Sequence, residues 1–181
     1  MYRDRLQKLR NAMVAMGIDG FIVSKPENQY YVSGFSGEGI TIITCDRTVV
    51  ITDFRYTEQA KEESPTFEVI ECSSNIAPFE ISCQIFKSSK TKTVGFEGHY
   101  VTVKQYDELA ALFEGLTLLK TDGVVEEIRT IKYPHELELM KRAQNITDET
   151  FTHILDFIKP GVTERMLANE MEHFMKVKGA D

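Results

Sequence analysis

The most constraining feature of this sequence is an alternation of two kinds of segment over its first 121 residues. Runs rich in β-branched and aromatic residues, which are typical of strands, occur at residues 20–23, 40–44, 48–52, 67–71, 93–97 and 116–120. Helix-like stretches lie near residues 55–63, 78–87 and 104–113, and an N-terminal helix is predicted to end at Gly17. Strands that alternate with helices predict an α/β fold, in which helices pack on the faces of a sheet.

The pattern changes after about Thr121, where the strand signals stop. Residues 134–158 place apolar side chains on one helical face, and Pro134 suits the first turn of that helix. Thr163 can cap a further helix that also carries an apolar stripe. Two such helices do not make a compact domain alone, because each stripe needs a covering partner. We therefore predict a complete domain over residues 1–121 and the start of a second domain over residues 122–181.

Composition narrows the classes of function. The chain is 42% hydrophobic and 27% charged, and it has no run approaching the ~20 apolar residues that span a bilayer, so no membrane role is predicted. Its net charge of −7 disfavours nucleic-acid binding. The N-terminus lacks the apolar run of a secretory signal, which predicts a cytoplasmic location. Cys45, Cys72 and Cys83 are too few for a disulfide framework and are predicted to be buried, reduced thiols.

The four histidines do not converge in the sequence on a metal site. Glu149 and His153 lie four residues apart, and Glu170 and His173 lie three apart, so each pair can share a helical face as in carboxylate-bridged di-iron bundles. That kind of site takes ligands from four helices and the sequence offers two, which favours solvated helix faces. Residues 97–99, Glu-Gly-His, predict a turn rather than a pair of ligands.

Residues 33–39 form the densest glycine stretch of the chain. Backbone amides in such a loop can cradle an anion, but the spacing matches neither the dinucleotide fingerprint nor the lysine-containing phosphate loop. The glycines instead predict positive φ angles in a tight connection. Further on, Asp53 is predicted to cap a helix, and Arg55 to make a charge-assisted contact or to hold a substrate carboxylate if a pocket opens beside it.

Four motifs follow one another across nearly the whole chain: NQYYVSGFSG at residues 28–37, TDFRYTEQA at 52–60, EEIRTIKYPHELELMKRAQNITD at 126–148 and IKPGVTERMLANEME at 158–172. The first is similar to an Asn-x-x-Tyr-Leu-Thr-Gly-Phe signature, and the second to a strand-to-helix Asp-x-Arg-Tyr element. The third is similar to an Arg-x-x-Lys-x-x-x-Glu segment that opens a catalytic domain. With this order and spacing, the chain resembles the creatinase/prolidase/aminopeptidase P family.

The resemblance implies a ribonuclease H-like mixed α/β sheet with flanking helices, followed by the first helices of a pita-bread peptidase domain. Family members hydrolyse bonds beside proline, in Xaa-Pro dipeptides or at the N-termini of longer peptides, with two Mn, Co or Zn ions. The two Asp, one His and two Glu that hold those ions lie C-terminal to the helices present here. The resemblance therefore implies no catalytic residue, no metal ligand and no hydrolysis by this chain alone.

In such proteins the N-terminal domain supports dimerisation and walls off the mouth of the active site. The resemblance thus implies a homodimer, a C-terminal catalytic domain as the missing partner and proline-containing peptides as substrates of the whole protein. Phe35, Gly37 and Arg55 are the predicted substrate-access residues. Two alternatives remain open, a free-standing binding or assembly module and a nuclease, which would need carboxylates clustered on adjacent strands.

Overall fold

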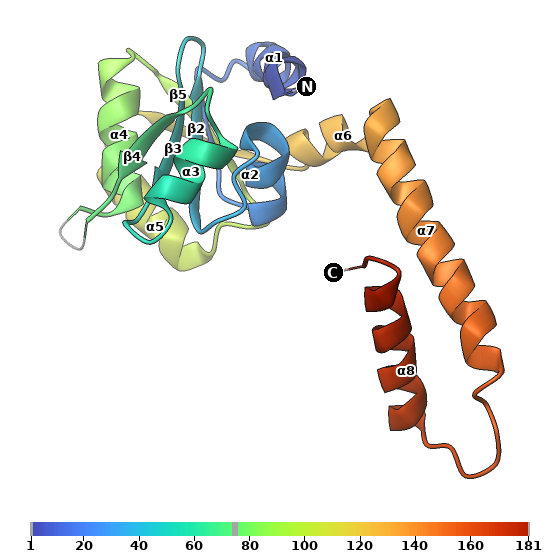
Figure 1. Cartoon of the computed structure of the whole chain (residues 1–181). Helices are drawn as coiled ribbons and strands as arrows, with labels where there is room; N and C mark the ends of the chain where they lie inside the picture. The colour runs from blue at the N-terminus through green and yellow to red at the C-terminus, as the bar shows by residue number, and fades with distance from the viewer. Residues whose placement is uncertain (1, 74–75, 181) are drawn as a thin grey trace. The chain divides into compact units, whose positions relative to one another are not determined.

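The computed structural model describes residues 2–73 and 76–180 (Figure 1). Contacts within the chain divide it into two units, of which the first runs to Thr130 and the second begins at Ile131. The first unit is built on a six-stranded sheet of order β4-β3-β2-β1-β5-β6. Its strands are β1 (Gly20–Val23), β2 (Gly39–Thr44), β3 (Thr48–Thr52), β4 (Glu68–Glu71), β5 (Thr93–Glu97) and β6 (Thr117–Thr121).

The sheet is mixed, which confirms the predicted α/β class. β1 pairs antiparallel with β2 and parallel with β5, while β2 and β3 form an antiparallel hairpin and the two edge strands run parallel to their neighbours. All six predicted strands form, with bounds within one residue of those expected. All four residues of β1 are buried, because this central strand is covered on both faces by helices.

The described residues of the first unit form six helices: α1 (Tyr2–Ala15), α2 (Pro26–Ser33), α3 (Thr57–Glu63), α4 (Pro78–Ser88), α5 (Val103–Leu112) and α6 (Val124–Thr130). One core cluster joins Phe21 of β1 to side chains of α1, α2 and α6, and the other joins Ile22 to side chains of α4 and α5. Phe21 and Ile22 reach opposite cores because successive strand residues point to opposite faces. The unit is thus a sheet between two layers of helices (Figure 1).

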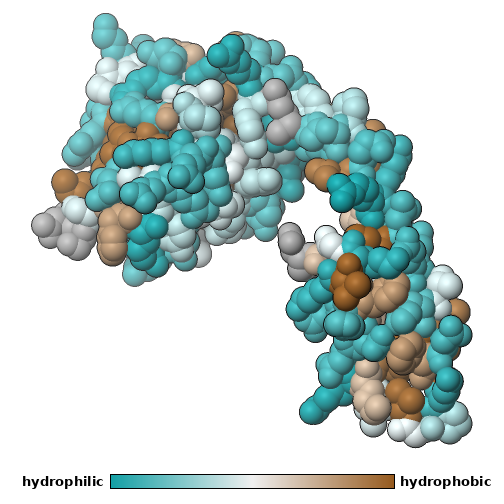
Figure 2. Space-filling model, viewed as in Figure 1, coloured by the Kyte–Doolittle hydropathy of each residue, from teal (hydrophilic) through white to brown (hydrophobic). Residues whose placement is uncertain are grey.

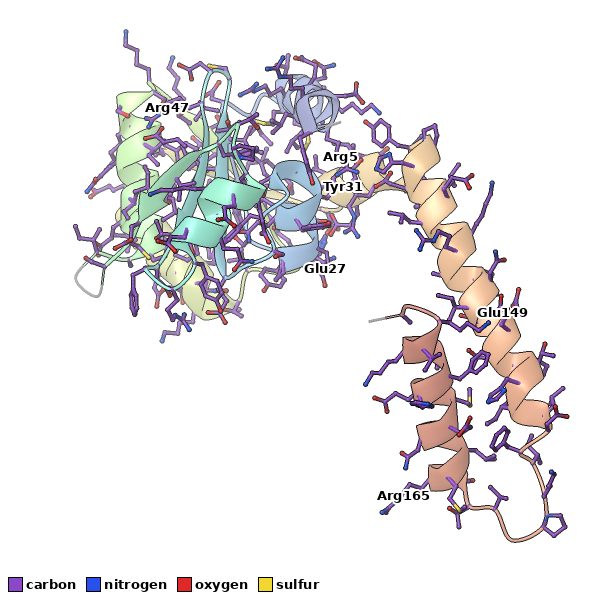
Figure 3. The ribbon with its side chains drawn as sticks, in the orientation of Figure 1. Arg5, Glu27, Tyr31, Arg47, Glu149 and Arg165 are labelled. Atoms are coloured by element: carbon purple, nitrogen blue, oxygen red, sulfur yellow. The ribbon has the colours of Figure 1, made fainter. Side chains whose placement is uncertain are left out.

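Two of these helices, α2 and α6, were not predicted. α2 has only eight residues, and the buried ones include Asn28, Gln29 and Ser33, so no apolar stripe marks it. α6 places Val125 in the core of the first unit. Arg5 of α1 donates to the carbonyl oxygen of Tyr31 in α2 at 2.8 Å, which ties these helices together (Figure 3). The domain boundary near Thr121 stays a prediction, although contacts group α6 with the first unit.

The second unit consists of two helices, α7 (Pro134–Leu155) and α8 (Glu164–Val177). As predicted, Pro134 lies in the first turn of α7, and the Thr163 hydroxyl accepts from the Met166 amide at the start of α8. Thr150 and Ile154 are buried in α7, and α8 buries none of its residues. Figure 2 shows brown, hydrophobic surface on this unit. The exposed large apolar side chains among its described residues are Ile131, Leu137, Leu139, Met140, Phe151, Leu155, Phe157, Ile158, Met166 and Val177.

The three cysteines differ in their surroundings. Cys83 is buried and Cys72 is half-buried, whereas Cys45 is exposed because it lies in the turn between β2 and β3. The prediction of three buried thiols is therefore wrong for Cys45. No helix in the described part of the chain combines the length and the apolar character needed to cross a bilayer.

Candidate functional site

The glycine loop of residues 33–39 forms one side of a pocket of about 350 Å³ in the first unit. β1 leads into this pocket through Ser24, α2 contributes its first turns, and the start of α3 closes another side. The lining residues are Ser24, Pro26, Gln29, Ser36, Gly37, Glu38, Gly39, Tyr56, Gln59 and Tyr100. Side chains from distant parts of the sequence therefore meet beside the predicted access loop.

The glycines of this loop serve different purposes. Gly34 ends α2 with a φ of +88°, the left-handed conformation that was predicted for the loop. Gly37 does not have a positive φ, but a Cβ there would lie 2.6 Å from the ring of Phe35. Glycine is therefore required at position 37 by close packing rather than by its backbone angles. Of these two glycines, the prediction of a positive φ is confirmed for Gly34 and wrong for Gly37.

The three predicted access residues occupy unlike positions around the pocket. Gly37 lines it, Phe35 is fully buried in the core with its ring against Gly37, and the Arg55 side chain is 53% exposed. Phe35 can thus act on the pocket only by supporting the loop. Whether these residues govern access to a substrate stays a prediction.

Arg55 makes the charge-assisted contact that the sequence predicted. Its Nη2 lies 2.7 Å from Oδ2 of Asp53 and 2.9 Å from Oε2 of Glu38. Hydrogen bonds and charge attraction from Asp53 raise the pKa of Arg55, and the bond from Arg55 in turn lowers the pKa of Asp53. The residue before α3 is Tyr56, so the prediction that Asp53 caps this helix is wrong; Asp53 instead accepts from the Arg55 amide in a local turn.

Behind the pocket, the buried carboxylate of Glu97 fixes the connection between β1 and α2. Its Oε2 accepts from the amides of Ser24 and Lys25, both at 2.7 Å, and its Oε1 accepts from Nδ2 of Asn28 at 2.5 Å. Burial raises the pKa of Glu97 in spite of these bonds. The sequence predicted only a turn here, although an acid at the end of a parallel strand is a recognisable signal for a site.

A second carboxylate, Glu126 of α6, extends this network. Its Oε1 accepts from Nζ of Lys25 at 2.8 Å and from Nδ2 of Asn28 at 2.9 Å. Burial opposes ionisation of Glu126, but these two bonds bring its pKa to about 2. His99 contacts Asp122 through Nδ1, and this hydrogen bond raises the pKa of His99. The network holds the first turn of α2 in place.

The described residues do not fit a two-metal centre, since no three His, Cys, Asp or Glu side chains among them are grouped closely enough to hold a metal ion. In the second unit, Nε2 of His153 lies 2.8 Å from Oε1 of Glu170, and its ring stacks on Phe174. Glu149 pairs with Lys178 instead of His153. The expectation of solvated faces is therefore wrong for His153, which lies between the two helices.

Two protein-family models match this chain. The model of the creatinase/prolidase N-terminal domain matches residues 5–131, and the model of metallopeptidase family M24 matches residues 138–181. The chain belongs to the creatinase/prolidase family. This creatinase/prolidase chain therefore carries the N-terminal domain of the family followed by a segment similar to M24 peptidases, in the order that its motifs predicted.

This creatinase/prolidase chain spans about half the length of the curated relatives that it matches first. It is 38% identical over 178 residues to YqhT, an uncharacterized peptidase of Bacillus subtilis strain 168, with 98% of this chain and 50% of the relative covered. The structure of an Xaa-Pro dipeptidase from Bacillus anthracis superposes with a TM-score of 0.93 at 32% identity and covers 99% of this chain and 50% of its own. The N-terminal domain of the cytoplasmic peptidase PepQ from Mycobacterium tuberculosis H37Rv has a TM-score of 0.64 at 33% identity, covering 68% of this chain and 97% of its own.

Proposed function

We propose that this chain is the N-terminal portion of a dinuclear-metal Xaa-Pro dipeptidase or Xaa-Pro aminopeptidase, and that it does not hydrolyse peptides alone. One observation carries the proposal: the chain matches about half of the full-length relatives. The apolar faces of α7 and α8, which the second unit leaves exposed, agree with it. In this proposal the other half of the protein covers those faces and supplies the ligands for two Mn, Co or Zn ions. The first domain covers residues 1–121, and residues 122–181 begin the peptidase domain.

The first unit contributes to dimerisation and to access to the active site. The pocket beside residues 33–39 supports the access role, because Gly37 lines it and Arg55 bonds to Glu38, which also lines it. The substrates of the whole protein are proline-containing peptides, in keeping with the names of its relatives. A cytoplasmic location is supported by the description of PepQ as a cytoplasmic peptidase.

The test compares this chain with a chimaera in which it is followed by the remaining half of the Bacillus anthracis dipeptidase. Both proteins are assayed for hydrolysis of Xaa-Pro dipeptides and of longer peptides with Xaa-Pro N-termini, each with added Mn²⁺ or Co²⁺. We expect turnover by the chimaera and none by the chain alone. Metal-dependent turnover that copurifies with the 181-residue chain would contradict the proposal.

The access role is tested by Arg55→Ala in the same chimaera. The variant is expected to alter the ratio of kcat/KM values for dipeptides and longer peptides while changing Tm little, since the Arg55 side chain is 53% exposed. Arg47→Ala is the matched control, because Arg47 (labelled in Figure 3) also pairs with a carboxylate, Glu68, at 2.8 Å. Glu68 does not line the pocket, whereas the Arg55 partner Glu38 does. Equal changes in both variants would argue for a general charge effect.

A second candidate function is a free-standing binding or assembly module, which the exposed apolar faces of α7 and α8 also favour. Such a module would form a defined dimer or bind a protein partner without any peptidase half. Gel filtration of the chain with light scattering distinguishes the two cases when it is repeated on the chimaera. A defined dimer through α7 and α8 that persists in the chimaera would support the module, whereas loss of that dimer in the chimaera would support the peptidase role.

A further inference from the structure

The pocket beside residues 33–39 contains a buried acceptor whose partner is not provided by the described residues. Gln29 is 1% exposed, and its Nε2 donates to the carbonyl oxygen of Gly37 at 2.9 Å. Because the Gly37 carbonyl oxygen can only accept, this bond fixes the orientation of the Gln29 side-chain amide. The Oε1 atom of Gln29 then remains as an acceptor for another group. Within residues 2–73 and 76–180, nothing donates to Oε1 of Gln29 or bonds to the buried hydroxyl of Ser24, and both residues line the pocket.

These two oxygens favour a ligand that donates hydrogen bonds. A buried amide oxygen left unpaired is unfavourable enough that native structures seldom retain one, so a donor group is expected to occupy the space in front of it. The Ser24 hydroxyl can accept a hydrogen bond while its own proton rotates away. An anion is disfavoured here, because the amide oxygen and the Glu38 carboxylate would repel it.

The walls of the pocket favour a donor that is also a cation. Tyr56 and Tyr100 line it, and the faces of aromatic rings attract ammonium groups. Glu38 is the charged residue among the described lining residues. Next to the lining residue Ser36, the Glu63 carboxylate accepts a hydrogen bond from the Ser36 amide at 2.8 Å. Burial opposes ionisation of Glu63, but the hydrogen bonds from Ser36 and Gln59 hold its pKa below the usual value. The Glu63 carboxylate therefore stays ionised at neutral pH.

We infer that this pocket binds the primary ammonium group of a small ligand, with Gln29 Oε1 and Ser24 Oγ as acceptors and Tyr56 and Tyr100 beside it. A volume of about 350 Å³ lies at the lower end of the range for small-molecule sites and suits a ligand of dipeptide size. Two sources offer this chemistry, the free amino terminus of a short peptide and the side chain of a lysine. The inference is independent of the proposed peptidase role, because it concerns binding to this chain and not hydrolysis.

The test is a titration of the 181-residue chain with methylammonium chloride, followed by the ¹H–¹⁵N signals of the Gln29 side-chain amide and of the Ser24 and Gly37 backbone amides. Tetramethylammonium chloride is the matched control, since it carries the same charge without an N–H donor. We expect saturable shifts of these signals with methylammonium alone. No saturable shifts, or equal shifts with both salts, would overturn the inference.

The source of the ammonium group is resolved by a second set of titrations. Gly-Pro is compared with N-acetyl-Gly-Pro, which lacks the ammonium group, and with Nα-acetyl-lysine amide, which carries it on a side chain. Stronger binding of Gly-Pro supports a peptide amino terminus, and stronger binding of the lysine derivative supports a lysine side chain. Binding of N-acetyl-Gly-Pro as tightly as Gly-Pro would refute the role of the ammonium group.

Two variants connect the binding to the named side chains. Ser24→Ala should raise the Kd about fivefold, the loss expected for one hydrogen bond, and the fold should persist because the Ser24 hydroxyl has no internal partner to lose. Tyr100→Ala should also weaken binding by several-fold. Tyr30→Ala is the control, since Tyr30 is an exposed tyrosine of α2 that does not line the pocket. Unchanged affinity in both pocket variants would contradict the inference.

Discussion

The two units of this chain form helices equally well but bury them very differently. In the first unit, α1, α2, α4, α5 and α6 each place side chains in one of the two cores of the sheet. In the second unit, Ile154 is the one buried hydrophobic side chain among the described residues. The comparison teaches that helix caps and periodic apolar residues are sufficient to define a helix, whereas a core requires a second surface to pack against.

The largest expected contrast comes from removing one phenylalanine from each unit. Phe86 of α4 is fully buried, with its ring centroid 5.9 Å from that of Phe113, and Phe86→Ala should lower the free energy of unfolding by about 3–5 kcal/mol. Phe151 of α7 is 64% exposed, so Phe151→Ala should change it by less than about 0.5 kcal/mol. Urea unfolding followed by circular dichroism measures both. Similar losses of unfolding free energy in the two variants would contradict the difference in burial between the two units.

The next effect concerns the carboxylate that holds the first turn of α2. Glu97→Ala leaves the amides of Ser24 and Lys25 without their acceptor in a buried position, and we expect a loss of about 2–4 kcal/mol in the same unfolding measurement. Glu27→Ala is the control, because Glu27 is an exposed acid in the first turn of the same helix and should cost less than about 1 kcal/mol. A loss for Glu97→Ala no larger than that control would show that Glu97 is not structural.

Glu126 is expected to make a smaller contribution to the free energy of unfolding, and this contribution should depend on pH. Its folded-state pKa of about 2 lies below the ordinary value of 4.5, so the folded chain binds this proton less tightly than the unfolded chain. The stability that Glu126 contributes is therefore fully present above about pH 4.5 and is lost as the pH falls toward 2. We expect about 1–2 kcal/mol of such stability, since its side chain is still 30% exposed. The difference in stability between the native chain and Glu126→Gln should shrink over this window, and a constant difference would refute the assignment.

The smallest expected change in stability comes from Leu139→Ala, and the same substitution should cause a large change in the chimaera. Leu139 of α7 is 59% exposed, so Leu139→Ala should change the stability of the chain by less than about 0.5 kcal/mol. If the remaining half covers this face, the same substitution in the chimaera should cost about 2–4 kcal/mol. Thermal unfolding of the four proteins provides the comparison. An equally small change in the chimaera would mean that the Leu139 face stays uncovered there.

Most of the fold was predictable because it depends on local patterns. The β-branched runs located the strands, and Thr163 and Pro134 located the helix starts in the second unit. The helices α2 and α6 were missed because they are short, and because the buried side chains of α2 are largely polar groups held by bonds to distant residues. Only the fold reveals those partners.

The candidate pocket was predicted in part, for a similar reason. The glycine density of residues 33–39 and the position of Arg55 pointed to this region. Gln29, Ser24 and Tyr100 were not singled out, since nothing local distinguishes a glutamine whose amide is fixed by Gly37 from an exposed one. Their meeting depends on the pairing of β1 with β5, which brings together segments about 70 residues apart.

Hydrogen exchange of the backbone amides tests most directly whether the first unit is complete and the second is not. In the 181-residue chain, the account predicts that amides of β1 and β5 exchange at least about a hundredfold more slowly than those of α7 and α8, because only the former lie within a closed core. In the chimaera, the amides of α7 and α8 should exchange more slowly, at rates closer to those of β1 and β5. Protection of α7 and α8 equal to that of β1 in the chain alone would contradict the account.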